Sequence, residues 1–313
     1  MALVPLLLIC VGLALVVISA DEAIKRVLNL AKHLRLSTFV MSFVIGGSIA
    51  ILPELFIGVV SAFEGVSSLG FGVILGSNVA DLTLVFGVVI LFAGNLKVDP
   101  ATLKHMRRSF LTIALPVLLF VDGEISRLDG IILVLFFILY MFMLFRTKRD
   151  EPDVSAKKGK NRFSIDVIVL VTSMAVLFVG GILITDNSQA LSLLLGVPLF
   201  LIGVVVAVGT CLPEMTFAIR ASVKKHGELG LGNILGNVLT DSMLTIGIVA
   251  LIQPIQPRFT IMALSTGVFM AVSALAVYVL SRDGKLDRKD GLLLVILYGI
   301  FLAMQTVIEG SVT

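Results

Sequence analysis

Four carboxylic acids lie inside long apolar stretches of the sequence, at Glu54, Asp81, Glu214 and Asp241. Placing an ionisable side chain in the middle of a membrane costs about 2.5–3.5 kcal/mol on insertion scales. No Lys, Arg or His stands at a comparable depth in these stretches, so none is available to neutralise the acids. The partners that remain are protons and bound cations. The sequence therefore predicts a cation site built from these four carboxylates.

Oxygen- and nitrogen-bearing side chains accompany three of the acids at helical spacing. The companions are Ser77 before Asp81, Asn237 before Asp241 and Thr210 before Glu214, each by four positions. Residues four apart share a helix face, and oxygen atoms are the ligands of hard cations such as Ca²⁺. The three histidines fall in predicted loops, and Cys10 and Cys211 are far apart in the chain. A hard-cation site is therefore favoured over a soft-metal site.

The composition indicates which elements carry these residues. Of the 313 residues, 58% are hydrophobic and 14% are charged, and the mean hydropathy is +1.10. Soluble domains carry about 25% charged residues, so a soluble enzyme, a disordered chain and a nucleic-acid-binding protein are disfavoured. We expect an all-α polytopic membrane protein, because a lipid-exposed backbone must satisfy its own hydrogen bonds.

Apolar segments near the length of a bilayer crossing recur along the whole chain. The ten predicted transmembrane helices cover residues 2–20, 38–62, 67–94, 109–121, 128–145, 165–185, 194–219, 229–252, 260–280 and 291–308. No basic residue precedes the first segment, which argues against a cleaved signal peptide.

Lysine and arginine predict the orientation. Of the 24 such residues, all but Arg127 and Arg258 fall on alternate connections between spans. The positive-inside rule places these basic loops in the cytoplasm and both termini outside. We expect a multi-pass protein of the plasma membrane. Its longest basic loop, 146–164, is interpreted as a tether rather than a lipid-headgroup or regulatory site.

The two parts of the chain on either side of this loop repeat each other. Leu52-Pro53-Glu54 recurs 160 residues later as Leu212-Pro213-Glu214, and Asp81 recurs as Asp241. Transporters commonly bind their substrate at the bilayer midplane, on helices broken by Gly or Pro. Pro53 and Pro213 are such breaks, because proline removes a backbone donor.

The number of spans in each part predicts how the repeats are related. Each part holds five, and an odd number makes the second repeat enter the membrane from the opposite side. The sequence thus predicts two inverted five-helix repeats, 1–145 and 165–313, joined by the basic cytoplasmic linker 146–164.

The paired motifs resemble the signature repeats of the cation/Ca²⁺ exchanger superfamily. IAILPE (49–54) and GVILGSNVAD (72–81) resemble the first repeat, and GTCLPE (209–214) and GNILGNVLTD (232–241) resemble the second. The closest branch is that of the prokaryotic Na⁺/Ca²⁺ exchangers, and the match covers nearly the whole chain. The resemblance implies the ten-span inverted fold and exchange of Ca²⁺ for Na⁺.

The resemblance also implies roles for individual residues. Glu54 and Glu214 would bind the cations, with Ser77, Asp81, Asn237 and Asp241 on the partner helices and Thr210 as a hydroxyl ligand of Na⁺. The chain departs from the family pattern where Ala50 and Ile51 replace a hydroxyl pair, Cys211 and Asn237 stand where Ser is common, and Asp81 stands where Asn is usual. The site therefore has fewer oxygen ligands for Na⁺ and one more acid.

We therefore expect a secondary active cation antiporter, not an enzyme, that exchanges Ca²⁺ for Na⁺ by alternating access at a midplane site of four carboxylates. The first and sixth spans would slide against the other helices. An H⁺-coupled or K⁺-involving exchanger of Ca²⁺ or another divalent cation stays open, because Asp81 adds a titratable group. The expected partners are inorganic cations and the lipid bilayer; no cofactor, nucleic acid or oligomer is required.

Other classes also use buried acids. An intramembrane aspartyl protease uses two of them as acid and base, but its Tyr-Asp and Gly-x-Gly-Asp signatures do not occur in the sequence. A cation channel can have acidic rings, but it does not require prolines within spans of both repeats. One protonated acid can join two helices; four acids in two matched pairs favour a bound cation.

Overall fold

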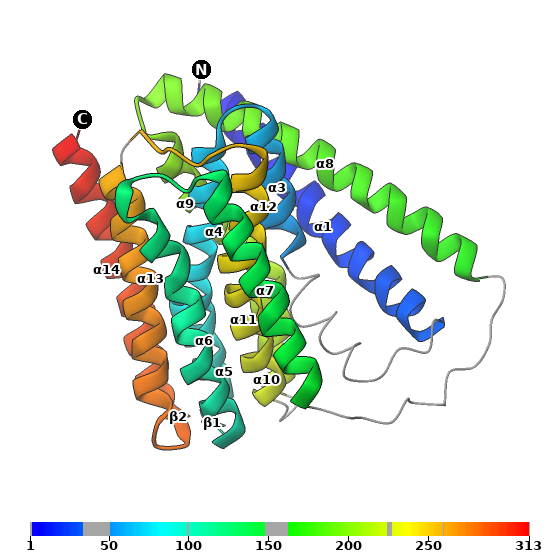
Figure 1. Ribbon diagram of the computed structural model, residues 1–313, viewed down its shortest axis with the longest axis vertical. Helices are drawn as coiled ribbons and strands as arrows, with labels where there is room; N and C mark the ends of the chain where they lie inside the picture. The colour runs from blue at the N-terminus through cyan, green and yellow to red at the C-terminus, as the bar shows by residue number, and fades with distance from the viewer. Residues whose placement is uncertain are drawn as a thin grey trace.

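The computed structural model describes residues 2–33, 51–98, 100–147, 162–223, 227–258 and 260–312, and nearly all of them are helical (Figure 1). The helices of the first part are α1 (Leu3–His33), α3 (Leu52–Phe63), α4 (Ser67–Ala80), α5 (Phe86–Ala93), α6 (Pro100–Leu119) and α7 (Arg127–Thr147). Those of the second part are α8 (Arg162–Leu195), α9 (Leu199–Thr210), α10 (Leu212–Val223), α11 (Gly227–Thr240), α12 (Ile246–Ile252), α13 (Thr260–Ser281) and α14 (Arg288–Val312). Two π-helical turns, η2 (Asp81–Val85) and η4 (Asp241–Thr245), continue α4 into α5 and α11 into α12, and a short turn, η3 (Phe120–Asp122), follows α6.

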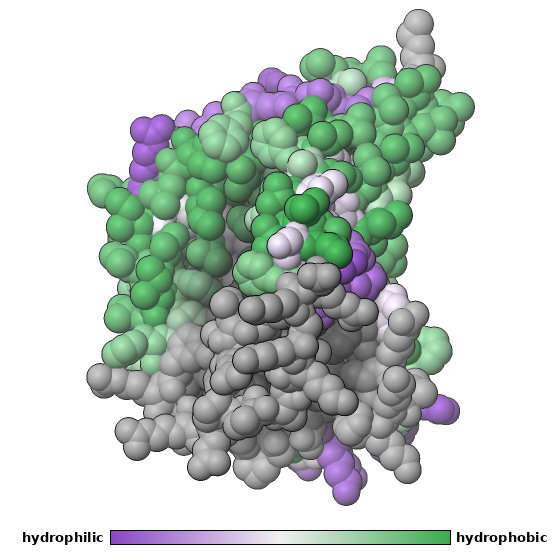
Figure 2. Space-filling model, turned by 90° about the vertical axis from the view of Figure 1, so that its right-hand side faces the viewer, coloured by the Kyte–Doolittle hydropathy of each residue, from purple (hydrophilic) through white to green (hydrophobic). Residues whose placement is uncertain are grey.

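The helices have the length and surface of membrane spans. Within the described residues, 7 helical stretches are long and apolar enough to cross a bilayer. Apolar side chains cover much of the described part of the face in Figure 2, and a hydrophilic band runs along its upper edge. Leu193 on α8 and Val307 on α14 are examples of large apolar side chains left exposed. The prediction of an all-α polytopic membrane protein is confirmed at this level.

Some helices extend beyond the predicted spans, and one predicted span is divided into two helices. α1 continues to His33 and α8 to Leu195, well beyond residues 20 and 185. The first extension is polar and is stabilised by side-chain pairs one turn apart, such as Lys25 with Asp21 at 2.7 Å. The predicted span 194–219 is divided at Cys211 into α9 and α10. Residues 38–50 of the second predicted span and 148–161 of the linker lie outside the described residues.

α1 and α8 form the most extensive helix pair, and they lie side by side, obliquely to the other helices (Figure 1). Glycines allow the close approach: a Cβ on Gly12 would lie 3.0 Å from the Gly180 carbonyl oxygen. At one end, Arg26 Nη1 donates to Asp166 Oδ1 at 3.0 Å, and Asp166 is buried. Gly12, in the first half of α1, thus lies against Gly180, in the second half of α8, whereas Arg26, late in α1, bonds to Asp166, early in α8. The two helices therefore run antiparallel.

Equivalent elements of the two parts recur at a constant offset. The bounds of α3 and α10, of α4 and α11, and of η2 and η4 differ by 160 residues. Equivalent helices also pack on equivalent partners in the two parts. α5 packs on α14, where a Cβ on Gly87 would lie 2.7 Å from Gly291 O, and α12 packs on α7, where a Cβ on Gly247 would lie 3.1 Å from Gly130 O.

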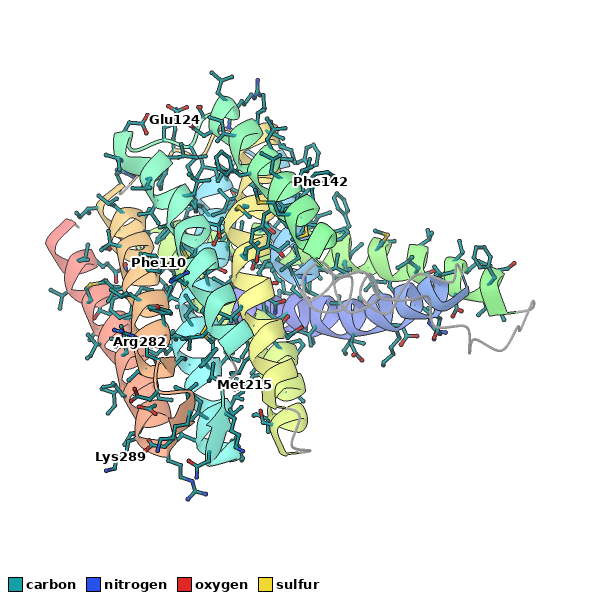
Figure 3. All side chains as sticks on the ribbon, turned by 60° about the horizontal axis from the view of Figure 1, so that its bottom comes forward. Phe110, Glu124, Phe142, Met215, Arg282 and Lys289 are labelled. Atoms are coloured by element: carbon teal, nitrogen blue, oxygen red, sulfur yellow. The ribbon has the colours of Figure 1, made fainter. Side chains whose placement is uncertain are left out.

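Short strand pairings join the two parts at opposite ends of the bundle. β1 (Asn95–Lys97) pairs antiparallel with β2 (Lys285–Asp287), and Ile125 pairs with Ile255. Both chain termini lie at the end away from β1 and β2 (Figure 1). Figure 3 places Glu124 at one end of the bundle and Lys289 at the other. α1 and α8, the first helices of the two parts, pack antiparallel on each other.

The ion pair between α1 and α8 generates a prediction. Asp166→Asn removes the charge that faces Arg26 in a buried position, so we expect the apparent Tm in detergent to fall by several degrees. Asp21→Asn is the matched control, because its partner Lys25 is exposed and such pairs contribute little. Equal Tm values for the two variants, measured by thermal unfolding, would contradict a stabilising role for the buried pair.

Candidate cation site

The four acids predicted from the sequence are all buried. Glu54, Asp81, Glu214 and Asp241 have exposed fractions of 3%, 3%, 5% and 2%. The two glutamates lie in the first turns of α3 and α10, and the two aspartates begin the π-turns η2 and η4. π-turns inside α-helices are frequent at functional sites. Each acid therefore lies at an irregularity in its helix.

Helix breaks explain how the glutamates are held. Pro53 occupies the first turn of α3, where a missing backbone N–H costs no helical bond. Pro213 does the same in α10, and the chain before it leaves the helix at Cys211, with φ −76° and ψ −5°. Glu54 and Glu214 each accept a hydrogen bond from their own backbone N–H. The free N–H groups and the dipole of a helix N-terminus favour negative charge there.

The acids meet partners from the opposite part of the chain. The Thr210 hydroxyl donates to Ala207 O at 3.0 Å and also lies within hydrogen-bond reach of Glu54. The Ser77 hydroxyl donates to Ile74 O at 3.0 Å and lies within reach of Asp241, and the Cys211 thiol lies within reach of Asp81. Asp241 also accepts from Thr245 Oγ1 at 2.8 Å within its own turn. The site is therefore shared between the two parts, rather than duplicated in each.

The charges of the acids act on one another. Glu54 interacts electrostatically with Asp81, Glu214 and Asp241. Three carboxylate oxygens in this group are buried and lack a hydrogen-bond partner, namely Glu54 Oε2, Asp81 Oδ1 and Glu214 Oε2. Unpaired buried acceptors of like charge repel one another. A cation or a proton would relieve this repulsion.

The oxygen-rich donor set suits a hard cation, but the side chains do not form a single coordination shell. Among the described residues, no three His, Cys, Asp or Glu side chains are close enough together to hold a metal ion. A bound ion would have to pull the carboxylates inwards or use the intervening hydroxyl and amide oxygens. Asn237 is buried on α11 one turn before Asp241, and Ser77 and Thr210 are also buried. Ala50 lies outside the described residues.

Sequence reasoning missed some polar groups at this site. Asn78 Nδ2 donates to Ser242 Oγ at 3.1 Å and joins α4 to η4 across the two parts. Both residues are fully buried. Their positions have no polar counterpart in the other repeat, where Val238 and Leu82 stand, so the search for repeated motifs could not find them. A polar residue next to Ser77 or Asp241 was the available signal.

Comparison with known proteins bears on this arrangement. The family model described as sodium/calcium exchanger protein matches residues 4–146 and 165–307. The chain belongs to this family. The resemblance read from the signature motifs is therefore confirmed at the level of the exchanger superfamily, and its members are transporters, not enzymes.

Two of the curated relatives match over nearly the whole chain, and a third matches over less than half of it. The sodium/calcium exchanger MaX1 of Methanosarcina acetivorans is 26% identical, and the alignment covers 97% of this chain and 99% of that protein. The putative antiporter CaxA of Alkalimonas amylolytica is 24% identical over 99% of this chain and 100% of its own length. Sodium/potassium/calcium exchanger 3 of Rattus norvegicus is 29% identical over 42% of this chain and 21% of its own length.

Solved structures share the fold. The sodium-calcium exchanger NCX_Mj superposes with a TM-score of 0.68 at 21% identity, covering 97% of this chain and 99% of that one. The H⁺/Ca²⁺ exchanger CAX superposes with a TM-score of 0.80 at 15% identity, covering 98% of this chain and 85% of that one. One fold thus accommodates exchangers named for different counter-ions.

The hydrogen bond between Asn78 and Ser242 can be tested for its part in holding the site together. Ser242→Ala leaves a buried amide without its partner, so we expect unfolding free energy to fall by about 1–3 kcal/mol. Thr216→Ala removes an exposed hydroxyl that bonds only to its own helix backbone, and serves as the control. Denaturant unfolding of both variants measures the difference, and an unaffected Ser242→Ala protein would count against the bond.

Proposed function

We propose that this protein is a secondary active antiporter that exchanges Ca²⁺ for Na⁺ at a site near the bilayer midplane. The observation that carries the proposal is the meeting of four buried acids, two from each part of the chain, with no basic partner among the described residues. Such a concentration of negative charge in a membrane interior requires a cation or protons. Membership of the sodium/calcium exchanger family supports the same conclusion.

Each residue of the site takes a role in this proposal. Glu54 and Glu214 bind Ca²⁺, because their carboxylates lie at helix breaks with unpartnered oxygens. Asp81 and Asp241 set the charge of the site. The remaining oxygen ligands are Ser77, Thr210 and Asn237. Na⁺ competes for these same oxygens, which makes the two ions exclude each other and couples their movements.

The proposed topology is ten transmembrane helices in two inverted five-helix repeats, 1–145 and 165–313, with linker 146–164 in the cytoplasm. The family model supports the division, because it matches the two repeats separately. The antiparallel packing of α1 on α8 supports the inversion. The position of both termini at one end, opposite β1 and β2, supports outward termini in a plasma membrane with basic loops inside (Figure 1).

Alternating access in this proposal comes from α1 and α8 sliding together against the other helices. Strand pairings join the loops next to α5–α7 and α12–α14, whereas α1 and α8 touch neighbours through helix packing within the described residues. The site, once empty, carries repelling charge and is costly to occlude, so ion-loaded forms cross more readily. Because the empty site crosses less readily, the outward movement of one ion is tied to the inward movement of the other.

A different counter-ion is the alternative. Asp81 adds an acid to the family pattern, and its carboxylate lies among three others, so protons could occupy the site in part of the cycle. H⁺-coupled or K⁺-involving exchange of Ca²⁺ or another divalent ion would use the same carboxylates. A channel is the remote alternative, and flux independent of any counter-gradient would reveal it.

Neutral variants of the glutamates test the site. Glu54→Gln or Glu214→Gln removes a charged oxygen ligand, so we expect ⁴⁵Ca²⁺ uptake into Na⁺-loaded proteoliposomes to fall to background. Glu124→Gln, at the end of the bundle, should transport normally (Figure 3). Wild-type uptake by either site variant, with normal incorporation into vesicles, would rule out the assignment.

The extra acid predicts a change in pH dependence. Protonation of Asp81 competes with Ca²⁺ as the pH falls, so Asp81→Asn should show weaker inhibition of Ca²⁺ uptake by acid than the wild type. Uptake measured across a pH series, with Na⁺, K⁺ and H⁺ gradients imposed separately, checks this and identifies the counter-ion. Asp122→Asn, on the exposed turn η3, is the control. An unchanged profile would remove Asp81 from proton coupling.

A further inference from the structure

We propose that Arg26 and Asp166 form a joint that fixes the register of α1 against α8, so that the two helices move as one body during transport. Both are then positioning residues for the exchange reaction, and neither contacts the transported ion. The inference rests on the function proposed above, because it names the residues that hold together the two helices described there as sliding.

Asp166 is a buried acid of a different kind from the four acids of the cation site. It lies in the first turns of α8 and is 2% exposed. Its neighbours Ile165 and Ile168 are apolar and are 54% and 65% exposed. Apolar side chains on the outside of a membrane helix face the lipid, so Asp166 is turned away from the lipid and into the contact with α1. A carboxylate in this setting needs a counter-charge.

Arg26 on α1 supplies that counter-charge. Its Nη1 donates to Asp166 Oδ1 at 3.0 Å, and Asn29 Nδ2 donates to the same oxygen at 3.3 Å. One turn earlier on α1, Glu22 Oε1 accepts from Arg26 Nε at 2.8 Å. Its own helix thus holds the guanidinium in place, and Asp166 receives two donors from α1.

The joint opposes movement of one helix along the other. A slip by one residue shifts the helices by about 1.5 Å, and hydrogen bonds weaken steeply when their distance and angle depart from the preferred range. A buried ion pair that is pulled apart leaves an uncompensated charge, which is strongly unfavourable. Apolar contacts have no such directional requirement. The ion pair therefore fixes a register that apolar packing would leave adjustable.

α1 depends on α8 for its position. Within the described residues, the packing of α1 on α3, α9 and α10 is slight beside its packing on α8. The two helices extend together, obliquely to the other helices (Figures 1 and 3). Movement of α8 therefore carries α1 with it only when the register between them is fixed.

The joint is present at one end of the helix pair. At the 160-residue offset, Arg26 corresponds to Asp186, and Asp166 corresponds to Leu6. Leu6 and Asp186 cannot form an ion pair, so the equivalent positions at the other end do not repeat the joint. The register is therefore set from the end that the basic loops place in the cytoplasm.

An apolar replacement separates positioning from stability. In a Cys10→Ala parent, Arg26→Leu with Asp166→Leu removes both charges together, and such replacements of buried ion pairs are often neutral for stability. We expect the Tm in detergent and the KM for Ca²⁺ to stay close to those of the parent. The maximal rate of ⁴⁵Ca²⁺ uptake into Na⁺-loaded proteoliposomes should fall at least tenfold. An unchanged maximal rate would overturn the inference.

Cross-linking tests the joint directly. Arg26→Cys with Asp166→Cys in the same parent breaks the ion pair, so uptake should fall as in the leucine variant. A bifunctional thiol reagent, added in detergent before reconstitution, then joins α1 to α8, while Cys211 is buried in every protein compared. We expect the covalent bond to restore uptake, because helices that move as one body tolerate it. Cross-linked protein that does not transport would overturn the inference.

The matched control joins α8 to a helix that does not move with it. Gln189 Nε2 on α8 donates to Glu64 Oε2, just after α3, at 3.4 Å. Glu64→Cys with Gln189→Cys, treated with the same reagent, should lose uptake on cross-linking. Uptake that survives would contradict the sliding of α8 and the inference with it. Absence of uptake from the untreated Cys10→Ala parent would instead reject the proposed function itself.

Discussion

Uncompensated negative charge in a membrane interior is the constraint on which this structure depends. Glu54, Asp81, Glu214 and Asp241 are buried without basic partners among the described residues. A charged group in this environment needs a counter-charge or a dense set of donors. The fold supplies some of these donors through the helix N-termini at Pro53 and Pro213, and others through hydroxyl and thiol groups. The rest falls to the transported ion, so charge balance and function are the same requirement.

The contacts across the repeats give the site its dependence on conformation. Thr210 faces Glu54, Cys211 faces Asp81 and Ser77 faces Asp241, each from the opposite repeat. A set of ligands shared in this way is complete only when the repeats are in register. A shift of one repeat against the other changes the number of oxygens around an ion, and with it the affinity. In the proposed exchange, this geometry would couple ion binding to movement.

Much of the fold, and the burial of the four acids, could be predicted from the sequence. Hydropathy located the helices, and the 160-residue offset matched elements whose bounds recur in the structure. The limits of α1 could not be found from hydropathy, because Asp21 and Lys25 continue the helix as a polar segment. The break at Cys211 lies close to Pro213, the residue that predicted a break in this span. Partners such as Asn78 and Ser242 depend on packing between distant segments, which a repeat search does not detect.

The matching bounds of the two repeats have a consequence for ancestry. One repeat alone, inserted into a membrane in both orientations, would supply the elements of this site as a homodimer. Fusion into a single polypeptide frees each copy to change without its twin. The two halves already differ at Asn237, which is opposite Ser77 in the repeat alignment, and at Cys211, which is opposite Ile51. Because each side of the site is encoded by its own stretch of sequence, the ligands can change on one side at a time.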